Sequence, residues 1–134
     1  MAQYQMREGQ TGTADAWTTL AGDGAGGTRN DITVPSGCKA IKQIIAIAAC
    51  GTTAGASTYG LKLLGNGLVG TATHEFALAS SVLGAGTLTD CNLIRPLVLD
   101  VDIPVQPNNQ IQIQAVMSGA DQGTPEVAVT LVFA

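Results

Sequence analysis

The stretch that decides the fold runs from residue 95 to residue 134 and reads RPLVLDVDIPVQPNNQIQIQAVMSGADQGTPEVAVTLVFA. It contains three segments in which apolar residues recur at every second position. These residues are Leu97, Leu99, Val101 and Ile103, then Ile111, Ile113, Ala115 and Met117, and finally Val127, Val129, Leu131 and Phe133. Side chains alternate between the faces of a strand, so this period predicts β-strands with one buried face. Turn-forming residues at 107–109 and 118–123 separate the segments, which predicts an antiparallel β-domain.

Shorter segments of the same kind occur upstream, where glycine-, proline- and serine-rich stretches interrupt them. The expected strands cover residues 3–7, 14–20, 32–34, 40–50, 57–64 and 74–79, with a turn at 9–12 and loops at 21–27 and 80–92. No segment has the period of a three-turn helix. About eight or nine short strands predict an all-β, antiparallel two-sheet sandwich, most simply a jelly roll, formed as a single domain over residues 1–134.

The composition is poor in charge. Charged residues make up 12% of the 134 residues, about half the ~25% of an average soluble domain. A lone soluble monomer normally keeps more surface charge, so this composition favours a protein covered by other subunits or one that works outside the cytosol. The six basic residues are scattered singly and the formal net charge is −4. We therefore expect no direct nucleic-acid binding, which needs a basic patch.

The sequence predicts neither a membrane span nor a secretory signal. The longest apolar run, residues 44–49, is far shorter than the ~18 residues that a spanning helix needs. The first eight residues lack the apolar core of a signal peptide. Together with the retained Met1, this favours a protein made and used without Sec export.

Three cysteines make an odd number, which argues against a disulfide framework. Cys38 and Cys50 flank one expected strand, whose twelve steps of ~3.3 Å would hold them roughly 40 Å apart. Any internal bridge must therefore use Cys91. The odd number favours free, partly buried thiols over such a bridge.

No motif predicts a catalytic, cofactor or metal site. Residues 22–27 and 65–70 both match G-x-G-x-x-G, but neither opens a helix in a βαβ unit, as a dinucleotide site requires. His74 is the only histidine, which rules out a multi-histidine metal centre. His74 and Glu75 fall on opposite faces of a strand and so make a poor acid–base pair. We expect no enzyme activity and no cofactor.

Asp100 and Asp102 form the most prominent acidic pair. At positions i and i+2 they project from the same strand face, about 6–7 Å apart. Such a pair can contribute to a Ca²⁺ site or meet a basic patch, but Ca²⁺ wants six or more oxygen ligands and no loop has the spacing of a calcium-binding motif. A solvated outer face explains the pair equally well, and we predict that both residues point outward.

The sequence resembles small single jelly-roll virion proteins of the capsid, cement or decoration type. The resemblance rests on Asp31–Gly37 (DITVPSG) followed by the apolar stretch 40–49, on the charge-poor Thr/Gly/Ala-rich loops, and on the strand that ends the chain. It implies a self-assembling structural protein located in the virion. Its partners would be further copies of itself and other virion proteins.

A ligand-binding β-sandwich, such as a carbohydrate- or receptor-binding module, is the alternative function. It would act as an extracellular or cytoplasmic soluble protein. Such modules present aromatic platforms, for which this chain offers Trp17, Tyr4 and Tyr59.

The strand at 40–50 predicts a homo-oligomer. Strict alternation assigns Ile41, Ile45, Ile47 and Ala49 to the core. The opposite face then carries Ile44, Ala46 and Ala48, joined on the last strand by Ala128 and Val132. An antiparallel sheet normally leaves its second face polar, so either the loops at 21–30 and 80–92 or a neighbouring copy must cover these residues. Glycine-rich loops offer little side-chain area, which favours the neighbouring copy.

Overall fold

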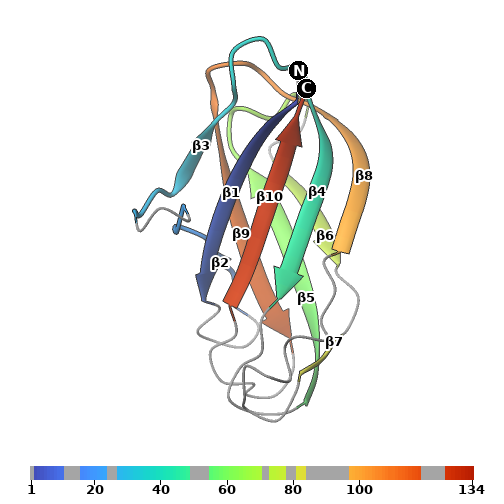
Figure 1. Cartoon of the computed structure of the whole chain (residues 1–134). Coiled ribbons are helices and arrows are strands. Elements are labelled where there is room, and N and C mark those ends of the chain that lie inside the picture. Colours follow the sequence, from blue (N-terminus) through green and yellow to red (C-terminus); the bar gives the residue numbers. More distant parts are fainter. Residues whose placement is uncertain are drawn as a thin grey trace.

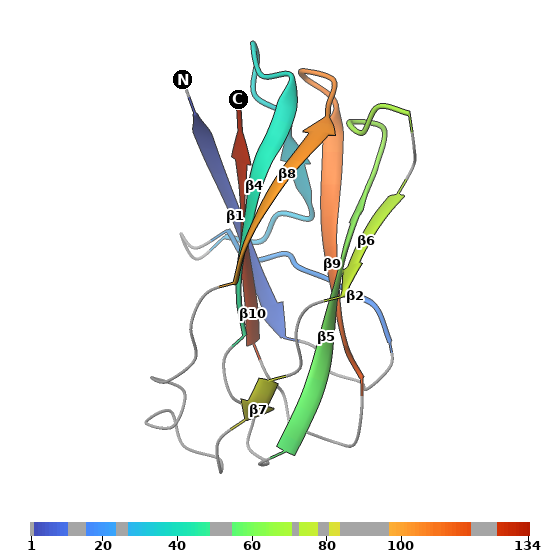
Figure 2. The same ribbon diagram turned by 90° about the vertical axis from the view of Figure 1, so that its right-hand side faces the viewer.

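The computed structural model describes residues 2–10, 16–23, 27–48, 55–70, 73–77, 81–83, 97–118 and 126–134. Within these ranges the chain forms ten β-strands and no helix. They are β1 (Gln3–Gln10), β2 (Thr18–Thr19), β3 (Asp31–Thr33), β4 (Ala40–Ala48), β5 (Gly55–Leu64), β6 (Thr73–Ala77), β7 (Ser81–Leu83), β8 (Leu97–Pro104), β9 (Gln110–Ser118) and β10 (Glu126–Phe133). Figures 1 and 2 show them in two facing sheets. The predicted all-β sandwich is confirmed.

The strands pair in a nested, antiparallel order. The outermost pair is β1 with β10, followed by β3 with β9, β4 with β8, and β5 with β6. Successive pairs belong alternately to two sheets. The four-stranded sheet has the order β1-β10-β4-β8. The six-stranded sheet has the order β2-β9-β5-β6, and in it β3 also pairs with β9 and β7 with β5. One long antiparallel hairpin rolled around a core gives this order, which is that of a jelly roll. The first and last strands consequently lie side by side (Figure 1).

The last three strands show the predicted alternation. The inward residues of β9 and β10 are buried and include Ile111, Ile113, Ala115, Val127, Val129, Leu131 and Phe133. Leu97, Leu99 and Val101 of β8 are partly buried against the same cluster. The intervening residues, such as Gln110 and Asp100, are exposed.

Apolar side chains from both sheets fill the space between them. Phe133, Ile41 and Ile44 come from the four-stranded sheet, and Leu61 and Ile113 come from the six-stranded one; each is fully buried. Burying one such side chain stabilises the fold by about 1.5–3 kcal/mol. This core requires no helix to cover it.

A β-bulge at Lys42 and Gln43 changes the facing of β4. Phe133 pairs with Ile41 and the adjacent Val132 pairs with Gln43, so β4 has one residue more than β10 between the two pairs. A bulge places two consecutive side chains on one face, and here Lys42 and Gln43 both lie outward. The following residues are therefore reversed from strict alternation: Ile44 and Ala46 enter the core, whereas Ile45 is half-buried and Ile47 is exposed.

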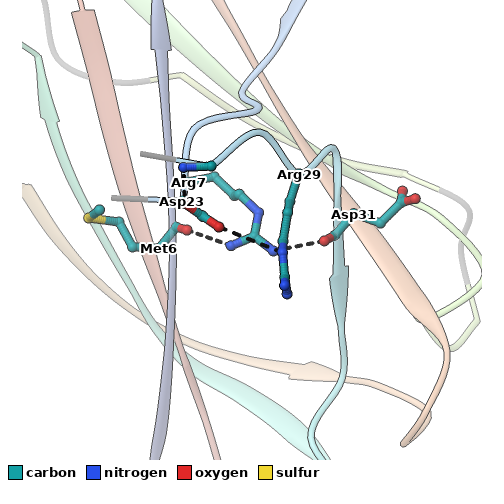
Figure 3. Close-up of polar contacts among 6 residues, drawn as sticks. Met6, Arg7, Asp23, Arg29 and Asp31 are labelled. Carbon is teal, nitrogen blue, oxygen red and sulfur yellow. Dashed lines mark hydrogen bonds and ion pairs between the residues drawn. The ribbon is translucent and has the colours of Figure 1, made fainter. Parts of the chain in front are cut away.

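Arg7 joins the two sheets at the open edge between β1 and β3 (Figure 3). Its side chain is only 5% exposed, and its Nη1 and Nη2 donate hydrogen bonds to the carbonyls of Met6 at 2.7 Å and Asp31 at 2.8 Å. Burial lowers the pKa of Arg7, while the nearby Asp23 carboxylate opposes that shift. Arg29 Nε pairs with Asp23 Oδ2 at 3.6 Å beside it. A cation thus takes the place of an apolar side chain at this edge.

Several element boundaries differ from those expected. Strand β1 runs to Gln10, into the turn expected at 9–12, and Glu8 and Gly22 exchange backbone hydrogen bonds near this end of it. Strand β2 is reduced to two residues, and β7 lies inside the loop expected at 80–92. The rest of that loop, the turn at 119–123, Leu78, Cys50 and Cys91 lie outside the described residues. Cys38 is buried as a free thiol.

The turn at Pro107–Asn109 forms where the sequence predicts it, and a second turn covers Gly65–Gly67. Asn108 has a φ of 68°, and Gly65 has a φ of 130°, both in the left-handed region that asparagine and glycine tolerate best. A Cβ on Gly65 would also collide with the carbonyl oxygen of Gln110. Glycine is therefore needed at position 65 for both its conformation and its size.

Candidate subunit interface

The outward side of the four-stranded sheet carries three rows of side chains. Directly paired residues share a face, so the register defines these rows. The first contains Tyr4, Val132, Gln43 and Asp100, the second Met6, Thr130, Ile45 and Val98, and the third Glu8, Ala128 and Ile47. We call these residues the apolar outer face, because seven of the eleven side chains are hydrophobic.

Large hydrophobic side chains remain open to solvent on this face. Tyr4 is 66% exposed, Val98 51% and Ile47 40%. Ile45 and Met6 are half-buried between them. The four strands run side by side across the face (Figure 1), so these residues form one patch that spans the sheet from β1 to β8.

The structure corrects part of the predicted interface. Ile44 and Ala46 are 0% and 3% exposed and belong to the core cluster, so they are not available to a partner. Ala48 pairs with Val127 through its backbone, and its side chain lies outside the described residues. Ala128 and Val132 do lie on the outward face, where Ala128 is half-buried but Val132 is only 6% exposed, so Val132 too offers little surface to a partner.

Ile45 and Ile47 take the places that strict alternation gave to Ile44 and Ala46. Sequence reasoning assigned both residues to the core. The signal that it overlooked is the polar pair Lys42–Gln43, two consecutive side chains that are ill suited to opposite faces of a half-buried strand. Such a pair within an apolar strand indicates a bulge.

Asp100 and Asp102 point outward, as predicted, at the β8 edge of the face. Asp100 Oδ1 accepts a hydrogen bond from Gln43 Nε2 at 2.9 Å. Asp102 Oδ1 pairs with Lys42 Nζ at 2.7 Å. Each carboxylate therefore has its own partner on the adjacent strand. Among the described residues, no group of three or more potential metal ligands contains them.

His74 faces inward from β6, where it pairs with Leu63 of the core. Its ring stacks beside Phe76 with centroids 6.4 Å apart, and its Nε2 is buried without a hydrogen-bond partner. Glu75 lies on the opposite face, as predicted, and pairs with Lys62 at 3.4 Å. His74 and Glu75 are thus not brought together as an acid–base pair.

The glycine motif at 65–70 forms the connection from β5 towards β6. Leu68 donates a backbone hydrogen bond to Gly65, and the next described element is the strand β6, not a helix. The motif at 22–27 includes residues outside the described ranges.

In the part of the chain that is described, no helix is long and apolar enough to cross a membrane.

No protein-family model matches the chain, and no curated protein matches its sequence. Solved structures do share the fold. One is a chain of the T13 IBDV viral particle, with a TM-score of 0.56 and 15% sequence identity. The match covers 99% of the present chain and 30% of the viral chain. Another is a chain from the Gx strain of infectious bursal disease virus, with a TM-score of 0.50 and 17% sequence identity. This match covers 99% of the present chain and 36% of the viral chain.

A third structure is the CBM36-1 domain of a multidomain xylanase from the hindgut metagenome of Trinervitermes trinervoides. The match covers 98% of this chain and 97% of that domain. Its TM-score is 0.41 and its identity 11%, which is too distant to bear on function.

The two viral likenesses define the class of fold, an antiparallel jelly-roll sandwich. They confirm the expected resemblance to jelly-roll virion proteins at the level of architecture, and this chain spans about a third of those viral chains.

Proposed function

We propose that the protein is a self-assembling structural subunit of a virion, either in the capsid or decorating it. The apolar outer face is the observation that carries the proposal. Both outer faces of a lone sandwich are normally polar, whereas Tyr4, Val98 and Ile47 leave this one apolar and open. The viral-particle chains support the proposal only through their shared fold.

A second copy suits this face better than the chain's own loops. Tyr4 and Val98 remain more than half exposed, and glycine-rich loops offer little side-chain area with which to cover them. The only full charge of the first two rows is Asp100, which Gln43 already hydrogen-bonds. A partner therefore meets few unpaired charges, and the contact is mainly hydrophobic.

The size of the face indicates how strong one contact is. Four strands ~4.8 Å apart and three rows ~7 Å apart give a patch of only about 14 Å by 14 Å between backbone centres. A stable two-body interface needs about 800 Å² from each partner. The face therefore forms the apolar centre of a contact that is weak alone and becomes stable when several contacts act together.

Assembly of the wild-type chain provides the direct test. Sedimentation velocity over a range of concentrations should show a monomer that converts cooperatively into large species, and electron microscopy should show those species as regular particles or sheets. A chain that remains monomeric at high concentration, alone and with candidate virion proteins, would refute the proposal.

A further inference from the structure

The outward side of the six-stranded sheet differs in character from the apolar outer face, because it is rich in side-chain amides. Gln110, Gln112 and Gln114 project outward from β9 at alternate positions. One row across the sheet consists of Thr19, Gln114, Lys62 and Glu75. The next consists of Asp31, Gln112, Leu64 and Thr73.

Neighbouring side chains hold two of these amides in place. Gln112 Nε2 donates to Asp31 Oδ1 at 2.9 Å, and Gln114 Nε2 donates to Thr19 Oγ1 at 3.3 Å. Each of these bonds uses one N–H of an amide that has two N–H groups and one carbonyl oxygen. Fixing an amide before a ligand arrives lowers the entropy cost of binding.

Trp17 lies beside the amides on the same face. It is 37% exposed, and its ring extends across β9 to β5, where Cη2 lies 3.2 Å from the position that a Cβ on Gly60 would occupy. Lys62 Nζ lies 4.2 Å from the ring centroid. Gly60 and Lys62 thus fix the indole against the sheet with part of its surface open.

The charges next to the indole are balanced. Lys62 Nζ pairs with Glu75 Oε1 at 3.4 Å while it contacts the Trp17 ring. Asp31 accepts the hydrogen bond of Gln112. Among the described residues, this face therefore offers amide donors and acceptors around an aromatic ring, and its one lysine is already paired with Glu75.

From this arrangement we propose that the outward face of the six-stranded sheet binds a neutral oligosaccharide. Amides form paired hydrogen bonds with sugar hydroxyls, and an aromatic ring packs against the apolar C–H face of a pyranose. The ~7 Å spacing of Gln112 and Gln114 along β9 allows successive amides to bind hydroxyl groups on different sugar rings of one oligosaccharide chain. This ligand site is separate from the assembly contact, since the two lie on opposite sides of the sandwich.

Trp17 is the chain's only tryptophan, so its fluorescence reports directly on this face. We would titrate the full-length protein separately with cellohexaose, xylohexaose, maltoheptaose and a high-mannose glycan. At least one should cause a saturable change in Trp17 emission. Gln112→Ala and Gln114→Ala should each weaken that binding by about 2- to 10-fold, the effect of one or two lost hydrogen bonds.

Gln106→Ala is the matched control, because it removes an exposed amide from the connection between β8 and β9, outside both sheet faces, where Gln106 Oε1 accepts a hydrogen bond from Asn109 Nδ2 at 2.7 Å. Its affinity should equal that of wild type. Trp17→Ala, measured by calorimetry, should lose binding about tenfold or more, with circular dichroism as the check on folding. Absence of a saturable signal with all four saccharides would overturn the proposal. Equal effects of Gln114→Ala and Gln106→Ala would also overturn it, as would binding of heparin but of none of the four neutral saccharides in a parallel titration. None of these variants alters the apolar outer face.

Discussion

Lys42 and Gln43 are consecutive in β4, yet their side chains lie on the same face and bond two residues of the neighbouring strand. Lys42 Nζ reaches Asp102 Oδ1 at 2.7 Å, and Gln43 Nε2 reaches Asp100 Oδ1 at 2.9 Å. This bulge decides which isoleucines of β4 enter the core. It therefore also determines the composition of the apolar outer face.

The reversal at the bulge predicts opposite behaviour for Ile44 and Ile47. Ile44 is fully buried, so Ile44→Ala should lower the free energy of unfolding by about 2–5 kcal/mol. Ile47 is 40% exposed, and Ile47→Ala should cost under ~1 kcal/mol. Urea denaturation of both variants at a concentration where the protein is monomeric measures the difference. Equal losses would show that the two side chains do not differ in burial.

Asp100 and Asp102 should be dispensable for folding. Their partners are Gln43 and Lys42 on an exposed edge, and exposed pairs contribute little. The double variant Asp100→Asn with Asp102→Asn should melt within a few degrees of wild type in circular dichroism. EDTA should leave both melting temperatures unchanged. A Ca²⁺-dependent rise in wild type that the double variant lacks would instead establish an ion site.

Arg7→Lys should destabilise the fold even though the charge is kept. The guanidinium bonds the carbonyls of Met6 and Asp31 with separate nitrogens, whereas one ammonium group cannot reproduce that fork. We expect a loss of about 1–3 kcal/mol in urea denaturation. Unchanged stability in Arg7→Lys would show that the two hydrogen bonds contribute nothing measurable.

The contribution of Arg7 should not vary with pH near neutrality. Burial lowers the pKa of Arg7 in the folded state, so the protonated form is less favoured there than in the unfolded chain. The free energy of unfolding can therefore rise only when the pH exceeds the lowered pKa and Arg7 loses its proton in the folded state. Arginine stays protonated well above neutral pH. The stability difference between wild type and Arg7→Met, which places no titratable group at this site, should therefore be constant from about pH 5 to pH 9; a steep change in it would contradict this assignment.

Two glycines with positive φ should differ in how they tolerate alanine. Gly65→Ala adds a left-handed alanine and a collision with the Gln110 carbonyl, whereas Gly70→Ala, at a φ of 86°, meets nothing within 4 Å. We expect a loss of about 1 kcal/mol at Gly70 and clearly more at Gly65. Thermal melting of the two variants ranks them. The reverse order would show that the turn relaxes freely at Gly65.

The jelly roll could be predicted from the sequence because its last three strands alternate without interruption. Apolar positions such as Ile111 and Ile113 are separated by glutamines, and Val127 to Phe133 repeat the pattern. A one-residue slip would place every apolar side chain of such a strand in water. Periodicity therefore fixes which face is buried, although it does not specify strand partners.

The site was predicted less well because one extra residue reverses the facing of all residues that follow it. Periodicity alone cannot distinguish the face of Ile44 from that of Ile45 in a strand that is apolar on both sides. The bulge depends on the pairing of β4 with β10 and β8, which are distant in sequence. The amide face was overlooked for a similar reason, since Trp17, Lys62 and Gln114 meet only through strand pairing.

The most direct test of self-assembly through the apolar outer face compares two identical substitutions at exposed valines. Val98 lies on that face and is 51% exposed, whereas Val69 is 38% exposed and lies outside it, in the connection between β5 and β6. Sedimentation velocity of Val98→Glu and Val69→Glu, both shown to be folded by circular dichroism, separates the effect of position from that of added charge. A carboxylate buried without a partner in a subunit contact is strongly unfavourable. The account predicts that Val98→Glu remains monomeric at concentrations where Val69→Glu and wild type assemble; equal assembly of all three would contradict it.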